Sequence, residues 1–148
     1  MRLSRAGELE ALAVVRRHRL VELFLVEVVG LDWSEVHTEA EVLEHVISDR
    51  LLARIDELLD HPTHDPHGDP IPDAAGNLPA ADPAPEEQLA LAAPGTYRVS
   101  RVPDADPDFL NWIQEQRLNP GAQLRMVSRD DLSGICLLYT SPSPRDRG

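Results

Sequence analysis

Apolar residues recur at helical intervals along the first part of the chain, where no proline interrupts them. All 13 prolines lie at or beyond Pro62, so residues 1–61 are free to form helices. The spacing of leucine, valine and phenylalanine predicts one helix from about residue 4 to residue 29. Ser4 is placed to cap its start, and Gly30 suits its C-terminal end.

Two more helices are predicted before the first proline. Asp32 and Glu35 have the spacing of a capping box, which predicts a helix that continues through Ile47. Ser48 is placed to cap a third helix at residues 50–59. Three helices this apolar cannot bury all their apolar side chains among themselves, so we expect a helical homodimer.

The composition of the chain changes after these helices. From His61 to about Pro94 it is rich in proline, alanine and aspartate, which is typical of a turn-forming loop followed by a flexible tether. Turn residues and short runs of strand-forming residues follow. They predict strands at 97–102 and 123–128, a short helical turn at 108–116 and a tight turn at 119–121. These pieces suit the start of a small β-barrel but are too few to close one.

The charge and composition of the chain restrict its partners. Its 148 residues include 26 acidic residues against 14 basic ones, all arginine, and the net charge is -12. Such a charge disfavours binding of a phosphate backbone by this polypeptide alone. The single cysteine, Cys136, offers no disulfide framework, and the sequence has neither a membrane-spanning apolar run nor a signal-peptide pattern. We therefore expect a soluble cytoplasmic protein that makes no membrane contact.

Histidine and glutamate side chains recur at helical spacing in the first two predicted helices. The pattern is formed by His18, Glu22, His37, Glu41, Glu44 and His45. His18 and Glu22 are four residues apart, so both can contact one ion from a single helix. In the second helix, the three residues after His37 follow it by four, seven and eight positions, which keeps all four within an arc of roughly 100°. Imidazole and carboxylate groups on a common face indicate a metal site.

Two other interpretations of this pattern remain open. Glu41, Glu44 and His45 are similar to the Glu-x-x-His unit of carboxylate-bridged di-metal enzymes, but that architecture draws ligands from four helices and only one approximate unit is present. The acidic face can also belong to a metal-independent dimerisation module, where it serves only to solvate the helix. Oxygen consumption with Fe(II) would favour the enzyme. Unchanged thermal stability with Mn(II), Fe(II) and Co(II) would favour the module.

A second group of potential ligands lies in the proline-rich segment. It consists of His61, His64, Asp65, His67 and Asp69. Because four prolines hold this stretch in turn and extended geometry, we interpret it as a structural loop that connects two units.

Three runs of the sequence carry a resemblance to a known family. They are His18-Arg19-Leu20-x-Glu22, residues 30–48 with Trp33, His37, Glu41, Glu44 and His45, and Pro66-His67-Gly68-x-Pro70-Ile71-Pro72. Together, over about residues 3 to 72, they resemble the diphtheria toxin repressor family of metal-dependent transcriptional regulators. Residues 89–131 are similar to the SH3-like (FeoA-type) C-terminal domain of that family. The resemblance implies a dimeric repressor, not an enzyme, with an N-terminal winged helix-turn-helix, a helical metal-binding and dimerisation domain, and a small barrel.

The resemblance also implies how the ligands are shared between two sites. It assigns His18, Glu22 and His37 to an ancillary metal site, and Glu41, Glu44 and His45 to a primary site. Further primary ligands come in the family from the first helix of the winged domain, which this sequence is expected to lack. The barrel of the family can lend ligands to the ancillary site. Asp106 falls near one such position, whereas Phe109 stands where a second polar ligand is expected.

The identity of one ligand bears on the metal. Iron-responsive members of the family have a cysteine at the position of Glu41, whereas manganese-responsive members have a glutamate as in this chain. Carboxylate oxygen suits harder ions, so we expect Mn(II) in preference to Fe(II) as the cofactor. Metal would join the helical domain to the winged domain, so that the dimer presents two recognition helices to operator DNA.

The expected architecture is mainly α, with a partial C-terminal SH3-like β-barrel and a missing N-terminal winged helix. We expect the helical metal-binding and dimerisation domain at residues 1–72, a flexible tether at 73–88 and the partial SH3-like domain at 89–134. Residues 135–148 resemble the translated read-through of a sequencing adapter, so we leave them out of the predicted fold. The chain is thus expected to be a fragment of a repressor of metal homeostasis, truncated at both ends.

Overall fold

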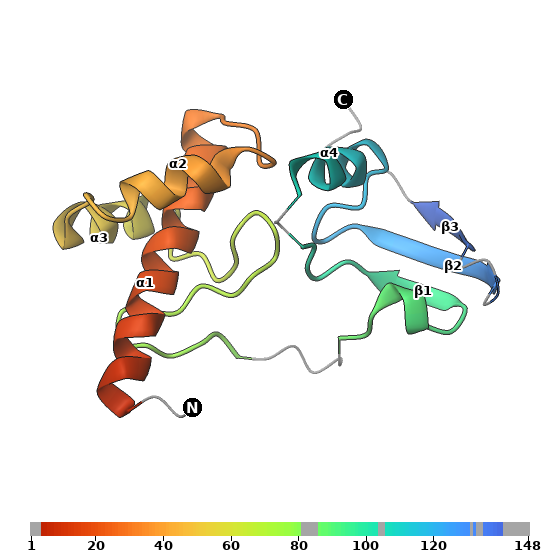
Figure 1. Ribbon diagram of the computed structural model, residues 1–148, viewed down its shortest axis with the longest axis horizontal. Helices are drawn as coiled ribbons and strands as arrows, with labels where there is room; N and C mark the ends of the chain where they lie inside the picture. The colour runs from red at the N-terminus through yellow and green to blue at the C-terminus, as the bar shows by residue number, and fades with distance from the viewer. Residues whose placement is uncertain (1–3, 81–85, 104–105, 131, 133–134, 141–148) are drawn as a thin grey trace. The chain divides into compact units, whose positions relative to one another are not determined.

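The computed structural model describes residues 4–80, 86–103, 106–130, 132 and 135–140. The chain divides into two compact units, residues 1–81 and 82–148 (Figure 1), and each is described by itself. Parts of the predicted tether and most of the predicted adapter-derived tail, at 81–85 and 141–148, lie outside the described residues. Within the described part of the chain, no helix is long and apolar enough to cross a membrane.

The first predicted helix is confirmed. It consists of α1 (Arg5–Phe24) and a π-helical turn, η1 (Leu25–Val29), that continues it. The Ser4 hydroxyl accepts a hydrogen bond from the backbone N–H of Gly7 at 3.1 Å, as expected of an N-cap. Gly30 ends the helix at a φ of 83°, a left-handed conformation that glycine adopts without steric cost.

The second helix, α2 (Val36–Leu43), is shorter than predicted at both ends. The capping-box prediction is wrong, because Asp32 Oδ1 accepts hydrogen bonds from the N–H and the hydroxyl of Ser34 at 2.9 and 2.7 Å. Aspartate often forms such a local turn in place of a helix cap. At the other end, Glu44 is the C-cap, and a turn follows at residues 44–46.

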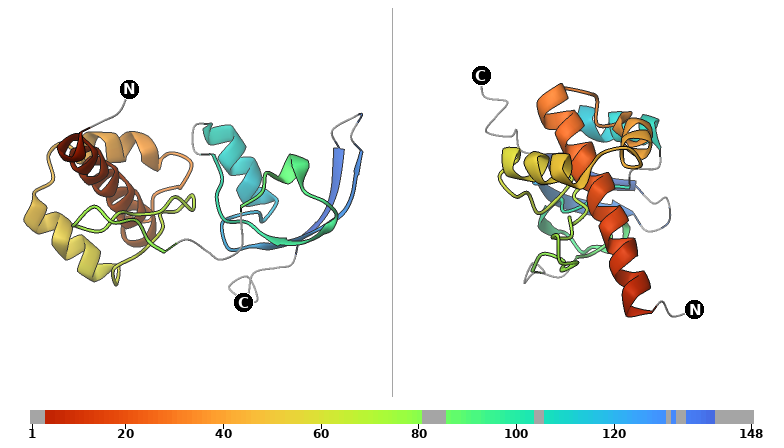
Figure 2. Two further views of the ribbon diagram at one scale, coloured as in Figure 1. Left: turned by 90° about the horizontal axis from the view of Figure 1, so that it is seen from below. Right: turned by 90° about the vertical axis from the view of Figure 1, so that its left-hand side faces the viewer.

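The third helix, α3 (Asp49–Leu58), begins and ends within one residue of its prediction. The Ser48 hydroxyl caps it by accepting a hydrogen bond from the N–H of Leu51 at 3.1 Å. Both α2 and α3 pack against α1. Figures 1 and 2 show α1 as the central helix of the first unit, with α2, α3 and the loop of residues 61–80 around it.

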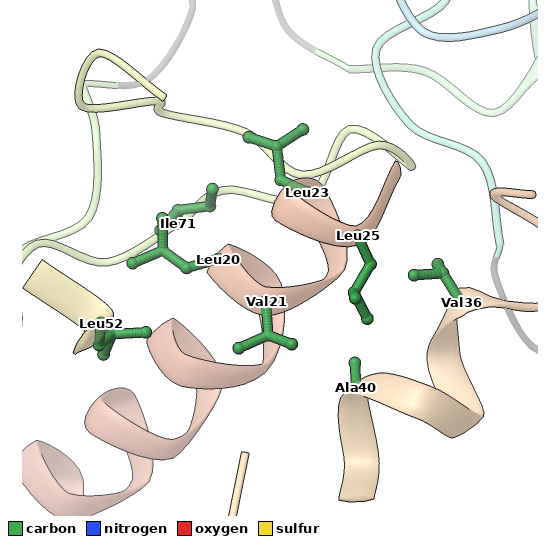
Figure 3. Packing of buried hydrophobic residues seen from close by; sticks show 8 residues of the cluster. All are labelled: Leu20, Val21, Leu23, Leu25, Val36, Ala40, Leu52 and Ile71. Carbon is green, nitrogen blue, oxygen red and sulfur yellow. The ribbon is translucent and has the colours of Figure 1, made fainter. Parts of the chain in front are cut away.

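The core of the first unit forms where these elements meet (Figure 3). Its buried members are Leu20, Val21, Leu23, Leu25, Val36, Ala40, Leu52 and Ile71. All three helices and the proline-rich loop contribute to this cluster. Removing these side chains from water stabilises the unit by roughly 1.5–3 kcal/mol for each large aliphatic side chain. The loop is thereby held against α1 at its Ile71 end.

Part of the segment predicted as a tether packs within the first unit. The N–H of Asp73 donates to the carbonyl of Asn77 at 2.9 Å, which closes a tight turn. Gly76 has a φ of +86° in this turn and lies against Leu9 of α1, because a Cβ atom there would come within 2.8 Å of Leu9 Cδ2 and the leucine side chain would have to move. Residues 73–77 are therefore folded against α1.

The second unit contains a small antiparallel sheet. Its elements are a 3-10 turn, η2 (Leu89–Leu91), strands β1 (Gly95–Arg98), β2 (Gln123–Asp130) and β3 (Ile135–Thr140), and helix α4 (Pro107–Glu115). The strand order is β1-β2-β3, and both pairings are antiparallel. β1 ends earlier than predicted because Arg98 pairs with Gln123, the first residue of β2, and the turn at 119–122 lies beyond it. The three strands form an open sheet.

β3 lies in the tail that was left out of the predicted fold. Residues 135–140 pair with β2 from Asp130 opposite Ile135 to Leu124 opposite Thr140. The pairing shifts register between Met126 and Ser128, as at a β-bulge. This pairing corrects the predicted fold, which leaves these six residues out. Their β-branched, aromatic and aliphatic residue types favour a strand whatever their origin. Their adapter-derived origin stays a prediction.

Candidate metal centre

Three of the predicted ligands meet where α2 packs on α1. His18 and Glu22 lie one turn apart on α1, and Nε2 of His18 contacts Oε1 of Glu22. His37, in the first turn of α2, places its Nδ1 at 3.0 Å from both of these atoms. We call His18, Glu22 and His37 the first triad. An octahedral ion with bonds of about 2.1 Å separates neighbouring ligand atoms by about 3 Å, so the spacing suits a metal.

The carboxylate of Glu22 is buried because α1 is covered on all sides at this level. The four consecutive residues from Leu20 to Leu23 are all buried, and Glu22 itself is fully inaccessible to solvent. A buried carboxylate is costly unless charged or hydrogen-bonding groups surround it. His18 and His37 meet this requirement at Oε1 in the absence of a metal.

The first triad is strongly polarised. The hydrogen bond to the Glu22 carboxylate raises the pKa of His18 to about 9, although burial opposes the shift. Burial alone would raise the pKa of Glu22, but His18 and His67 beside it bring this pKa down to about 2. The metal-free centre therefore holds an imidazolium and a carboxylate, and a metal ion would replace the proton of His18.

Glu41, Glu44 and His45 do not form one stripe on a helix. Glu41 is in α2, with Oε1 at 3.1 Å from His37 Nε2, whereas Glu44 and His45 follow the end of the helix. Glu44 instead faces α1, where its Oε2 lies 2.8 Å from Nδ1 of His18. His45 is 76% exposed, and its Nε2 lies 3.5 Å from Glu44 Oε1. His37, Glu41, Glu44 and His45 were expected to share one helix face. This expectation is corrected, because α2 ends at Leu43 and only His37 and Glu41 lie within it.

The proline-rich loop brings two further potential ligands to the centre. Asp65 and His67 are buried, and each offers a ligand atom within 4.8 Å of the other and of Glu22. We call Glu22, Asp65 and His67 the second triad. The loop also has the structural role expected of it, because Asp65 Oδ1 accepts hydrogen bonds from the N–H groups of His67 and Asp69, both at 2.9 Å. The same side chain can therefore shape the loop and face a metal.

His67 is held in one orientation by Trp33. Its Nε2 donates to the carbonyl of Trp33 at 2.9 Å, and the two rings stack with centroids 5.3 Å apart. Nδ1 of His67 then faces Oε2 of Glu22 at 3.3 Å. Within the described residues neither of these two buried atoms has a hydrogen-bond partner of good geometry. When His67 is neutral, its Nδ1 and Glu22 Oε2 both offer lone pairs, and a cation can bind between them.

The other members of the loop cluster lie outside the second triad. His61 pairs with Asp56 of α3 at 2.8 Å, and His64 contacts the hydroxyl of Thr63 at 2.9 Å. These two histidines therefore make local contacts, whereas Asp65 and His67 also lie close to Glu22. The pairs differ in burial, because His61 and His64 are exposed whereas Asp65 and His67 are buried.

Asp106 belongs to the second unit and caps α4. Its Oδ1 accepts a hydrogen bond from the N–H of Asp108 at 3.0 Å, and the residue is exposed. Phe109 stacks on Trp112 with ring centroids 6.1 Å apart. Asp106 thus has a structural role as an N-cap, and its role as a metal ligand stays a prediction.

The donor set at the junction of α1, α2 and the loop consists of imidazole nitrogens and carboxylate oxygens. Such ligands bind Mn(II), Fe(II) and Zn(II), whereas thiolate would select softer ions. Asp65 is also buried, which raises its pKa to about 6 in the absence of a cation. A divalent cation would compensate the charge of the carboxylates gathered here, so the residues fit a metal.

Comparisons with known proteins agree with this chemistry. Residues 4–73 match the family model of the iron-dependent repressor metal-binding and dimerisation domain. The chain is 44% identical over 134 residues to the iron-dependent repressor IdeR of Mycobacterium tuberculosis, covering 84% of this chain and 58% of the relative. It is 30% identical over 138 residues to the diphtheria toxin repressor of Corynebacterium diphtheriae, covering 88% of this chain and 61% of the relative. The chain thus spans about three fifths of these curated relatives.

Solved structures extend the similarity to the fold. A manganese-dependent transcriptional repressor in complex with manganese is 46% identical, with a TM-score of 0.87, and the match covers 93% of this chain and 65% of that one. A second structure of a manganese-dependent transcriptional repressor has the same identity and TM-score, and 74% of it is covered. The named relatives are repressors and not enzymes. The chain belongs to the diphtheria toxin repressor family of metal-dependent transcriptional regulators.

Proposed function

We propose that this chain is the metal-sensing and dimerisation part of a DNA-binding transcriptional repressor that responds to Mn(II) or Fe(II). The observation that carries the proposal is the position of Glu22. Its fully buried carboxylate turns Oε1 toward His18 and His37, and Oε2 toward His67. One carboxylate between two groups of nitrogen and oxygen donors is well placed to bind a divalent cation or to bridge two.

The first triad is the proposed ancillary site, with Glu44 as a fourth donor through its contact with His18. Asp65 and His67 extend it on the side of the loop. Glu41 and His45 would contribute to a primary site together with ligands from the winged domain. The described contacts run from Glu41 through His37, Glu22 and His18 to Glu44, so the two sites share a continuous set of donors.

Manganese is the proposed physiological ion, with iron as the second candidate. Glu41 and the carboxylates of the second triad supply oxygen, which suits Mn(II), and no described residue of the centre offers a thiolate. Both metals occur among the relatives, because one is an iron-dependent repressor and another is a manganese-dependent repressor. Binding either metal would neutralise the acidic centre and link α1, α2 and the loop.

The regulatory step would lie outside the metal-binding unit itself. We propose that metal favours one arrangement of a homodimer, in which winged domains read an operator, with an SH3-like domain formed around β1, β2 and β3. Large exposed apolar side chains on the first unit support a dimer, among them Val28, Val29, Leu31, Val42 and Val46. A coupling of about 1–3 kcal/mol between metal and DNA is usual for such a switch. The site of action would be the cytoplasm.

Metal-dependent stability tests the proposal. Mn(II), Fe(II) under anaerobic conditions or Co(II) should raise the unfolding temperature, because a ligand at roughly 100 times its Kd stabilises the folded state by about 2.7 kcal/mol. Glu22→Gln should remove most of this effect. Glu39→Gln, at an exposed position of α2, is the matched control and should retain it.

Three results would contradict the proposal or its central residue. An unfolding temperature that does not respond to any of the three metals would favour the metal-independent dimerisation module. Oxygen consumption by the Fe(II)-loaded protein would favour the di-metal enzyme. Retained metal stabilisation in Glu22→Gln would overturn the central role given to this carboxylate.

A further inference from the structure

Arg17 connects α1 to the segment that joins α2 and α3. Its Nε donates to the carbonyl of Glu44 at 3.1 Å, and its Nη2 donates to the carbonyl of Ile47. Its Nη1 pairs with Oδ1 of Asp49 at 2.5 Å. The guanidinium therefore contacts the end of α2, the turn and the start of α3 together.

These acceptors explain why an arginine is suited to this position. The last carbonyl groups of a helix have no partners within the helix, and a cation near them is favourable. Arginine presents its donors in a rigid planar fork. A single guanidinium that binds three acceptors therefore fixes the positions of these acceptors relative to one another. The Arg17 side chain is 22% exposed, which reduces the competition from water.

Glu44 is held at both of its ends by neighbouring residues of α1. Arg17 binds its carbonyl, and His18 contacts its carboxylate at 2.8 Å. The backbone hydrogen bonds of the turn itself, such as Ile47 N–H to the carbonyl of Leu43 at 3.0 Å, attach it only to α2. Arg17 is thus the polar link between the backbone of this turn and α1.

We propose that Arg17 is a positioning residue that holds Glu44 against His18 and so attaches the Glu44 carboxylate to the first triad. This inference rests on the proposed function, because it concerns the same metal centre. Arg17 would touch no metal itself. It would act through Glu44, in the way that outer residues orient the ligands of metal sites.

A double-mutant cycle on the full chain tests the inference, with Mn(II) and Co(II) as the titrated metals. Arg17→Met should weaken metal affinity by roughly 10-fold or more, which is usual when the residue that orients a ligand is lost. Glu44→Gln should weaken it as well. In the Glu44→Gln background, Arg17→Met should cause no further loss, because its effect passes through the missing carboxylate.

Arg16→Met is the matched control for loss of packing and charge. Arg16 is the preceding residue of α1, is 13% exposed, and also donates to a backbone carbonyl, that of Pro72 at 3.0 Å. We expect both variants to melt at lower temperature in chelator, but only Arg17→Met to change metal affinity. Arg17→Lys keeps the charge without the fork and should recover part of the affinity. The absorption spectrum of bound Co(II), which reports its ligand geometry, should change in Arg17→Met and not in Arg16→Met.

The possible failures are distinguishable. If Glu22→Gln abolishes binding and Arg17→Met does not change it, the inference is overturned while the proposed function stands. An equal loss from Arg17→Met with and without Glu44→Gln would also overturn it. If Arg17→Met does not fold, Arg17→Lys replaces it in the double-mutant cycle with Glu44→Gln, and the same comparison tests the inference. If Glu22→Gln binds metal as the unmodified chain does, the proposed function itself fails.

Discussion

His67 Nδ1 lies 3.3 Å from Glu22 Oε2, and both side chains are fully buried. The contact joins the proline-rich loop to the centre of α1, so that the loop and two helices meet at one carboxylate. A substitution at His67 is therefore expected to affect both folding and metal binding.

Replacing His67 by phenylalanine tests this relationship. The ring can still stack on Trp33, but both ring nitrogens are lost, so the Trp33 carbonyl and Glu22 Oε2 face an apolar group. We expect the metal-free protein to lose about 1–3 kcal/mol of stability, the usual cost of unsatisfied buried polar groups. Chemical denaturation with and without Mn(II) measures the change. His64→Phe, at an exposed position of the same loop, should leave both stability and metal response nearly unchanged.

The stability of the metal-free protein should depend on pH through His18 and Glu22. The pKa of His18 rises on folding from 6.5 to about 9, so its contribution is complete below pH 6.5 and is lost as the pH rises through 9. The pKa of Glu22 falls on folding from 4.5 to about 2, so its contribution is complete above pH 4.5 and is lost as the pH falls through 2. Their joint contribution is therefore greatest between pH 4.5 and 6.5.

Denaturation in the presence of a chelator, at pH values from below 4.5 to about 9, measures the effect. His18→Gln should flatten the alkaline side of the profile. A profile for His18→Gln that still falls between pH 6.5 and 9 would assign the loss of stability to another group.

Metal binding should release a proton. Because the pKa of metal-free His18 is about 9, the imidazole is protonated at neutral pH and must lose its proton to bind a metal. The apparent affinity for Mn(II) is thus expected to increase with pH up to about 9. Calorimetric titration in two buffers with different ionisation enthalpies counts the released protons. Equal heats in the two buffers would show that His18 does not exchange its proton for metal.

Leu20→Ala should strongly destabilise the first unit. Leu20 is fully buried and belongs to the core cluster that α1 shares with α2, α3 and the loop. Deleting a buried leucine side chain costs about 2–5 kcal/mol, depending on how far the cavity collapses. Leu58→Ala, whose side chain is on α3 and 63% exposed, should change stability by less than about 0.5 kcal/mol. Thermal and denaturant unfolding of the two variants compares the sites directly.

Gly76→Ala tests whether residues 73–77 are packed or free. Gly76 has a φ of +86°, and an added Cβ would lie 2.8 Å from Leu9 Cδ2. Gly30→Ala is the matched control, since Gly30 has a φ of +83° and no atom near the added Cβ. We expect Gly30→Ala to cost about 1 kcal/mol through backbone strain alone, and Gly76→Ala to cost more because the contact with Leu9 is added. A neutral Gly76→Ala variant would mean that this segment behaves as a tether in solution.

Local features of the fold could be predicted well from the sequence. Ser4 and Ser48 cap α1 and α3 as expected, because a helix cap depends on residues three positions apart. His18 and Glu22 were expected to act together for the same reason. Residues that lie one helical turn apart are neighbours wherever the helix is placed.

The relative positions of distant segments were decided by tertiary packing. Asp65 and His67 meet Glu22 because Ile71 buries itself in the core, and no local pattern in the loop encodes that contact. Glu44 lies just beyond Leu43, the last residue of α2, and contacts His18 of α1, a placement that helical spacing alone does not predict.

Sequence alone thus determined the presence of the three helices, the caps of α1 and α3, the ligand types and the family resemblance. The tertiary structure alone determined that Glu22 is buried between two groups of donors and that residues 135–140 pair as a strand. The physical reason is the range of the interactions. Capping and periodicity act within a few residues, whereas burial and strand pairing join segments far apart in the chain.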